Sequence, residues 1–221
     1  MLVLAERPLA ALLGALALNL VLAGIGVAAG LVLVGDQAKY FRELAPGTWL
    51  SWGQLLLIAA TVWAVRTRAD RDVPWWRSFW GLSAVFFVLF AFDEITQFTI
   101  FAADALERGF GARPSAGFHD VQAVLLTMLF TAAALILLPR ALVLLRHPLG
   151  LALLGAGAAL GAASQALDSF GPATRWEFVA EETLKLGAEA FLLGGFLVVL
   201  RDVLARTVRR DSSAARVSQA A

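Results

Sequence analysis

The last apolar stretch of the chain carries ionisable residues at a spacing that would bring them together on one side of a helix. Residues 175–206 read RWEFVAEETLKLGAEAFLLGGFLVVLRDVLAR. With 100° per residue, four of the charged side chains fall within an arc of about 100° and can all face neighbouring helices instead of lipid. These four are Glu181, Glu182, Lys185 and Glu189. Ionisable groups at membrane depth cost at least about 2.5 kcal/mol each, so they turn inward, pair, and mark sites or pathways.

Two interpretations of this arc stay open. Lys185 lies three or four residues from each of the three glutamates, so ion pairs within the helix could make the arc a purely structural network. One lysine cannot neutralise three glutamates, which favours a functional site. In either case we expect Lys185 to be the internal counter-ion of the arc and not a catalytic base.

The composition places these residues in a membrane protein. The chain has 221 residues, of which 60 % are hydrophobic and 16 % charged, and its mean hydropathy is +0.76. Cysteine is absent, which excludes disulfides, thiolate metal sites and cysteine catalysis. The net charge of +1 and the lack of a basic stripe argue against a nucleic-acid partner.

We therefore expect an all-α, polytopic membrane protein with six transmembrane helices in one bundle. The expected spans cover residues 8–35, 48–65, 75–106, 119–145, 148–170 and 175–206. Residues 1–206 would form a single domain, and the Ser-, Ala- and Arg-rich residues 207–221 a disordered cytoplasmic tail. Within the spans, Asn19 is a candidate for hydrogen bonding between helices, and Gly157 and Gly161 would let two backbones approach closely.

The distribution of basic residues predicts the orientation. With six spans, both termini share a side with the second-to-third and fourth-to-fifth loops. That side carries twelve of the eighteen Lys and Arg residues, the opposite side carries five, and Lys185 lies within a span. The positive-inside rule then predicts cytoplasmic termini in a cell inner (plasma) membrane.

Polar residues of several spans fall at one depth in this topology. The third and fifth spans run outward and end in polar groups, while the fourth and sixth run inward and begin with them. The sequence thus predicts a carboxylate-rich pocket in the outer half of the bilayer. Its expected members are Asp93, Glu94, Gln97, Asp168, Glu181, Glu182, Lys185 and Glu189.

Carboxylates from several helices with one imidazole would suit a divalent metal ion such as Mn, Fe, Mg or Zn. The candidate ligands are Glu94, His119, Glu181 and Glu182. The second histidine, His147, lies between Arg146 and Pro148 in a short basic loop, where we expect it to be solvated.

A resemblance to a family of uncharacterised bacterial multi-pass membrane proteins is carried by TWLSWGQLLLIAA, FWGLSAVFFVLFAFDEITQF and EETLKLGAEAFLLGGFLVVL. That family has a Thr-Trp second span, a Leu-Asp-Glu third span that ends in His-Glu, and a last span that opens Glu-Glu-x-x-Glu. The resemblance implies that the matching acids are Asp93 and Glu94 in the third span and Glu181 and Glu182 in the sixth.

The chain departs from the family pattern at two places. Thr99-Ile100 stands where the family has His-Glu, and Lys185 stands where it has the third acid of the last motif. If the family's histidine is a metal ligand, this chain has lost it or replaced it with His119. A distant analogy in fold links the pattern to the alkaline ceramidase superfamily, whose several-histidine zinc pattern is missing here.

Three functions are compatible with these residues. One is a metal-dependent intramembrane enzyme that acts on a lipid-like substrate, in which the ion would activate water or polarise a carbonyl or phosphoryl group. The second is a non-enzymatic cation or proton site for transport or sensing. The third is an accessory subunit whose acids pair with a membrane partner protein.

The topology can be tested with reporter fusions. Fusions at Gly35 and Gly111 should report an extracytoplasmic position, and fusions at Asp70 and the C-terminus a cytoplasmic one, because of the twelve-to-five distribution of basic residues. A cytoplasmic signal at Gly111 would overturn the assignment.

Overall fold

The computed structural model describes residues 2–34, 46–68, 74–111, 121–170 and 174–220. All of its elements are helices, which confirms the all-α prediction for this part of the chain. In chain order they are α1 (Leu2–Glu6), α2 (Pro8–Val34), α3 (Pro46–Arg68), α4 (Pro74–Thr96), α5 (Phe98–Phe110), α6 (Val121–Leu137), the 3-10 helix η2 (Leu138–Arg146), α7 (Pro148–Phe170) and α8 (Arg175–Ala220).

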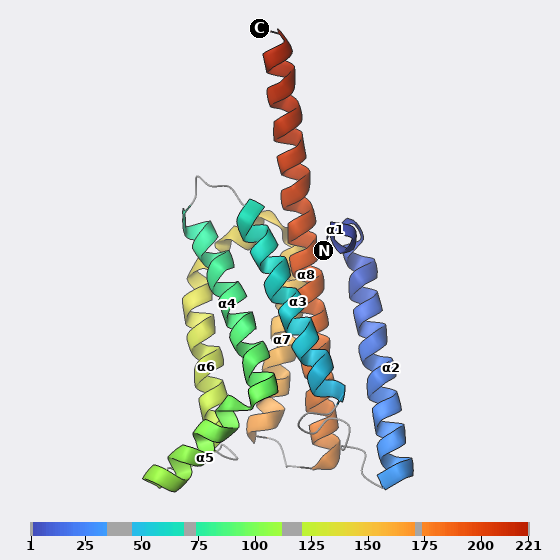
Figure 1. The fold of residues 1–221 in the computed structure, drawn as a ribbon, viewed down its shortest axis with the longest axis vertical. Coiled ribbons are helices and arrows are strands. Elements are labelled where there is room, and N and C mark those ends of the chain that lie inside the picture. Colours follow the sequence, from blue (N-terminus) through green and yellow to red (C-terminus); the bar gives the residue numbers. More distant parts are fainter. Residues whose placement is uncertain (1, 35–45, 69–73, 112–120, 171–173, 221) are drawn as a thin grey trace.

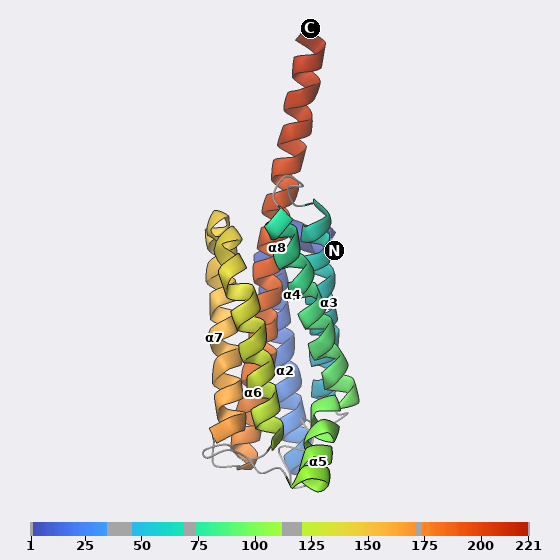
Figure 2. The same cartoon turned by 90° about the vertical axis from the view of Figure 1, so that its left-hand side faces the viewer.

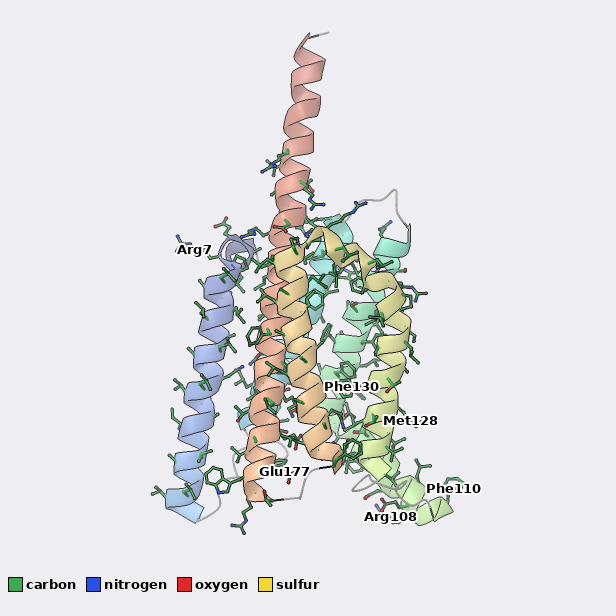
Figure 3. All side chains as sticks on the ribbon, turned by 180° about the vertical axis from the view of Figure 1, so that it is seen from behind. Arg7, Arg108, Phe110, Met128, Phe130 and Glu177 are labelled. Atoms are coloured by element: carbon green, nitrogen blue, oxygen red, sulfur yellow. The ribbon has the colours of Figure 1, made fainter. Side chains whose placement is uncertain are left out.

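The chain is a six-span membrane protein, as the sequence predicts. Within the described residues, six segments are long and apolar enough to cross a bilayer, and they are carried by α2, α3, α4, α6 with η2, α7 and α8. The bundle has two ends. Glu177 and Arg108 lie at the end where α5 is found, and Arg7 lies at the opposite end, where α8 leaves the bundle (Figure 3). We refer to these as the α5 end and the α1 end.

Helix α8 is the axis of the bundle. In the most apolar stretch of its span, 67 % of the residues are buried inside the protein. The corresponding share is at most 50 % in each of the other spans. Helices α2, α3 and α7 pack along α8, while α4 packs on α3 and α6 joins α4 to α7 (Figures 1 and 2). A side chain on α8 can therefore face several other helices. Side chains on the outer helices are less buried, and many of them face lipid.

Glycines allow α7 to lie directly against α8. A Cβ atom at Gly157 would lie 2.9 Å from the carbonyl oxygen of Ala188 and 3.0 Å from the amide nitrogen of Leu192. One at Gly195 would lie 2.7 Å from Cγ of Leu154. Apolar side chains gain little from leaving lipid, so close contact of backbones drives this association. The prediction of close approach at Gly157 is confirmed.

The expected third span, 75–106, is not one helix. Gln97 adopts a left-handed conformation (φ 55°, ψ 34°) and separates α4 from α5. Both carboxylate oxygens of Asp93 accept from Thr99, one from its amide at 2.8 Å and one from its hydroxyl at 2.9 Å. Asp93 thereby supplies a partner for an amide in the first turn of α5, which has none within that helix. Helix α5 turns away from the bundle (Figure 1).

The expected fourth span, 119–145, also changes form. Helix α6 ends at Leu137 and continues as η2, in which Pro139 occupies the first turn. Proline has no amide hydrogen and clashes with the preceding turn, which disrupts an α-helix at this point. Residues 119 and 120, where we expected this span to begin, lie outside the described residues.

Helix α8 continues to Ala220, well past residue 206 where we expected the last span to end. Its last part extends alone beyond the α1 end (Figure 2). The division into a domain at 1–206 and a disordered tail at 207–221 stays a prediction. An isolated helical segment of this length is only marginally stable in water, because no tertiary packing supports it.

Replacing Gly157 by alanine should destabilise the bundle by roughly 1–3 kcal/mol, because the new methyl group meets backbone atoms of α8 that cannot move aside. Gly155 is the matched control, since no atom lies within 4 Å of its Cβ position. Thermal unfolding in detergent would measure both variants. Equal melting temperatures for Gly157→Ala and Gly155→Ala would contradict the close contact between α7 and α8.

Candidate functional site

Lys185 joins two helices at the centre of the candidate site. Its Nζ lies 2.7 Å from Oε1 of Glu182, one turn earlier on α8, and 3.1 Å from Oε1 of Glu94 on α4. Glu182 is buried and Glu94 is half-buried. The ammonium group thus holds two carboxylates from different helices in one ion-paired triad, which is the geometry expected of an internal counter-ion.

Glu189 lies one turn further along α8 and has a different partner from the one its spacing suggests. The hydroxyl of Ser51 on α3 donates to its Oε1 at 2.5 Å, and both residues are buried. Its second oxygen, Oε2, is buried without a hydrogen-bond partner among the described residues. Glu189 is therefore a carboxyl group in the bundle interior with one oxygen satisfied and one open.

A third set of polar groups links α2 and α3 to α8 close to the triad. The amide nitrogen of Gln54 donates to Oδ1 of Asn19 at 2.7 Å, and Nδ2 of Asn19 donates to the backbone oxygen of Leu186 at 2.8 Å. The role predicted for Asn19 is confirmed. The amide oxygen of Gln54 is buried and, in the described part of the chain, unpartnered.

We define the polar layer as the residues Asn19, Ser51, Gln54, Glu94, Glu182, Lys185 and Glu189. It draws on four helices, α2, α3, α4 and α8. Ser51 and Gln54 were missed by the sequence analysis. A sequence signal for them exists. Thr48, Ser51 and Gln54 recur every three residues in an apolar span that also contains Thr61, which indicates one polar side of the helix.

Three other predicted members of the site have structural roles or partners outside the triad. Asp93 caps α5, and Gln97 forms the break between α4 and α5. Asp168 accepts from the side chain of Gln165 at 3.0 Å on its own helix, α7. Glu181 is half-buried, and its backbone oxygen accepts from the hydroxyl of Ser164 at 3.1 Å.

Glu177, the first acid of α8, completes a capping box. The Thr174 hydroxyl accepts from the Glu177 amide at 3.1 Å, and Oε2 of Glu177 accepts from the Thr174 amide at 3.0 Å. This reciprocal pair satisfies two backbone donors at the helix start. Glu177 therefore marks the α5 end of α8 and belongs to its cap.

The predicted metal ligands are only partly described. His119 lies outside the described residues, which contain no group of three or more His, Cys, Asp and Glu side chains arranged to hold a metal. Glu94 and Glu182 both contact the ammonium group of Lys185, which supplies a positive charge between them. A metal bound by Glu94, His119, Glu181 and Glu182 remains a prediction.

The expectation for His147 is wrong. The side chain is buried, with 4 % exposed, and its Nδ1 lies 3.1 Å from Oδ2 of Asp202 on α8. The residue caps the end of η2 directly before α7 begins, so its ring is enclosed where η2, α7 and α8 meet. The adjacent basic and proline residues suggested a loop, but they gave no sign of the partner 55 residues away.

Comparison with known proteins identifies a family match for nearly the whole chain. Residues 8–200 match the family described as Domain of unknown function (DUF8692). The match begins at the first residue of α2 and ends in the buried part of α8, so it contains the complete polar layer. No curated protein and no solved structure matches the chain.

Replacing Lys185 by methionine should lower the free energy of unfolding by roughly 3 kcal/mol, because two partly or fully buried carboxylates lose their counter-ion. Adding Glu182→Gln to Lys185→Met should recover a good part of this loss. Thermal or denaturant unfolding in detergent would measure both variants.

Arg108→Met provides the control for this prediction. Arg108 pairs with Asp104 on the surface of α5, with 77 % and 50 % of the two side chains exposed, so its loss should cost at most about 0.5 kcal/mol. An Lys185→Met protein as stable as the control would exclude the counter-ion role. Unchanged stability with loss of bound metal would instead assign Lys185 to the surroundings of a metal site.

Proposed function

This chain belongs to the DUF8692 family, and we propose that it binds a proton or a small cation in the membrane. The proposed site is centred on Glu189 and would serve transport or sensing. The observation that carries this proposal is the buried Oε2 of Glu189, which has no hydrogen-bond partner in the described part of the chain and belongs to a layer in which three acids share one lysine. The family match covers residues 8–200 but assigns no activity to them.

Charge balance supports a site that takes up positive charge. Glu94, Glu182 and Glu189 lie in the polar layer, and Lys185 is the only basic residue of that layer. An uncompensated carboxylate inside a bilayer is costly, so such groups bind a proton or a cation. Three acids share one ammonium group, so the layer keeps an excess of negative charge. Lys185 contacts the two acids of the triad and Glu189 contacts a neutral hydroxyl, so we assign the uptake of a proton or a cation to Glu189.

The surroundings of Glu189 are suited to this role. The hydroxyl of Ser51 fixes one carboxyl oxygen, and the second oxygen has no donor among the described residues. A proton on Oε2 would convert this oxygen into a donor. The unpartnered amide oxygen of Gln54, three residues after Ser51 on the same helix, is a further buried acceptor in the polar layer.

The arrangement along α8 supports access from the α5 end. The acids Glu177, Glu181, Glu182 and Glu189 follow one another from the helix start, over a length of about 18 Å at 1.5 Å per residue. Towards the α1 end, every residue from 193 to 200 is buried and apolar. The ring of Phe196 packs edge-to-face on the rings of Trp80 and Phe87, with ring centroids 6.3 Å and 5.7 Å away. These side chains would close the site on that side.

The orientation forms part of the proposal. Arg7 lies at the α1 end and Arg108 at the α5 end (Figure 3). By the helix bounds, the α1 end also has Arg68 at the end of α3, Arg146 at the end of η2, and Arg201 and Arg206 on α8, whereas the α5 end has Arg175 at the start of α8. The positive-inside rule then places the α1 end in the cytoplasm and opens the site to the outside of a bacterial inner membrane.

A metal-dependent enzyme acting on a lipid-like substrate is a second candidate, supported by half-buried Glu181 next to Glu182. This enzyme would need His119, which precedes α6 in the sequence, as a metal ligand. The analogy in fold to the alkaline ceramidase superfamily also points to this candidate. An accessory subunit that pairs with a membrane partner protein is a third. Metal analysis of protein purified without chelators would separate the second from the proposed function.

Infrared difference spectra of the protein in liposomes, recorded between two pH values, would test the proposal. The wild type should show a protonated carboxyl band that Glu189→Gln removes and that Ser51→Ala shifts, because the hydroxyl contacts this carboxyl group. Asp104→Asn, which removes an exposed acid, should leave the band in place. A band that persists in Glu189→Gln would show that Glu189 is not the site.

A further inference from the structure

A basic hollow lies on α8 where this helix leaves the bundle at the α1 end. Its volume is about 170 Å³, and it is lined by Asp202, Ala205, Arg206 and Arg209. These positions follow one another at spacings of three, one and three residues and form one face of the helix. The small side chain of Ala205 leaves the space between the two arginines and the carboxylate.

The one acid of the hollow has its own partners. Oδ2 of Asp202 lies 3.1 Å from Nδ1 of buried His147, and Oδ1 lies 3.3 Å from the guanidinium of Arg201. The hollow thus combines this one carboxylate with two guanidinium groups, and its net charge is positive. Arg206 and Arg209 give the rest of the hollow its positive charge.

Arg206 is positioned by a contact with the neighbouring helix. Its guanidinium donates to the backbone oxygen of Arg146, the last residue of η2, at 3.1 Å. A guanidinium has five N–H donors in a planar fork, so this single bond leaves donors that match the oxygens of a phosphate group. The contact also fixes the hollow next to η2.

Helix η2 also carries exposed apolar side chains. Val143 and Leu144 are buried against the core, whereas Leu138, Leu142 and Leu145 are between 63 % and 71 % exposed. In a 3-10 helix residues three positions apart lie above one another, so Leu142 and Leu145 form a short apolar row. Leu145 directly precedes Arg146, so the row ends next to the residue that contacts Arg206 of the hollow.

We propose that the hollow binds the phosphate group of an anionic phospholipid, whose acyl chains lie along the exposed leucines of η2. A phosphate diester carries a negative charge for Arg206 and Arg209, and its attached chains fit the apolar row. Free phosphate shares the charge but has nothing to place against η2, so the neighbouring apolar surface favours a lipid.

Native mass spectrometry of the full chain, delipidated in detergent, would test this site. Phosphatidylglycerol should bind, and the double change Arg206→Gln with Arg209→Gln should weaken its binding about 30-fold, since each basic residue at a membrane surface contributes about fivefold. Arg108→Gln removes an exposed arginine at the α5 end and should bind as the wild type does.

Two further ligands and three further variants distinguish the remaining outcomes. Equal binding of phosphatidylcholine would show general contact with lipid, and competition by inorganic phosphate as strong as that by the lipid would show a site for a free anion. Either result overturns the proposal, as does unchanged binding in the double variant. Arg206→Lys keeps the charge but not the fork, so it should bind more weakly than the wild type and more tightly than Arg206→Gln. Arg209→Gln leaves the bond to Arg146 intact and keeps the test valid if variants of Arg206 fail to fold.

Discussion

The ammonium group of Lys185 is the constraint on which the polar interior of this bundle depends. A charge between α4 and α8 cannot rely on bulk water, so Glu94 and Glu182 have to lie within ion-pair distance of it. The pairing fixes the facing sides of two helices. Once these are fixed, the next turn of α8 directs Glu189 to Ser51 on α3. One ionic contact thus sets the rotation of α8 relative to its neighbours.

Packing around α8 complements this network. Glycines at the contact of α7 and α8 bring the two backbones together, and on the opposite side Asn19 bonds to a backbone oxygen of α8. Lipid supplies little force to join apolar surfaces, so close van der Waals contact and hydrogen bonds hold the bundle. The most buried helix, α8, also carries more residues of the polar layer than any other helix. Stability and the candidate site depend on the same element.

Both ends of the bundle use irregular backbone where polar groups meet the membrane boundary. At the α5 end, Asp93 satisfies the start of α5 after the break at Gln97. At the α1 end, Pro139 converts the end of the fourth span into η2, and His147 is enclosed against Asp202. These breaks change the direction of the chain without leaving the amides concerned unsatisfied. They also bring polar side chains into contact at each end, Asp93 with Thr99 at the α5 end and His147 with Asp202 at the α1 end.

The sequence by itself determined the six spans, the charged arc of α8 and the role of Asn19, because span length and helical spacing are local properties. It placed Lys185 correctly within the arc but could not choose among its acids. The tertiary structure paired Lys185 with Glu94, 91 residues away, and Glu189 with Ser51, 138 residues away. It also turned Asp93 to Thr99 and buried His147. Such choices depend on the rotation and break points of neighbouring helices, which spacing along a single helix does not contain.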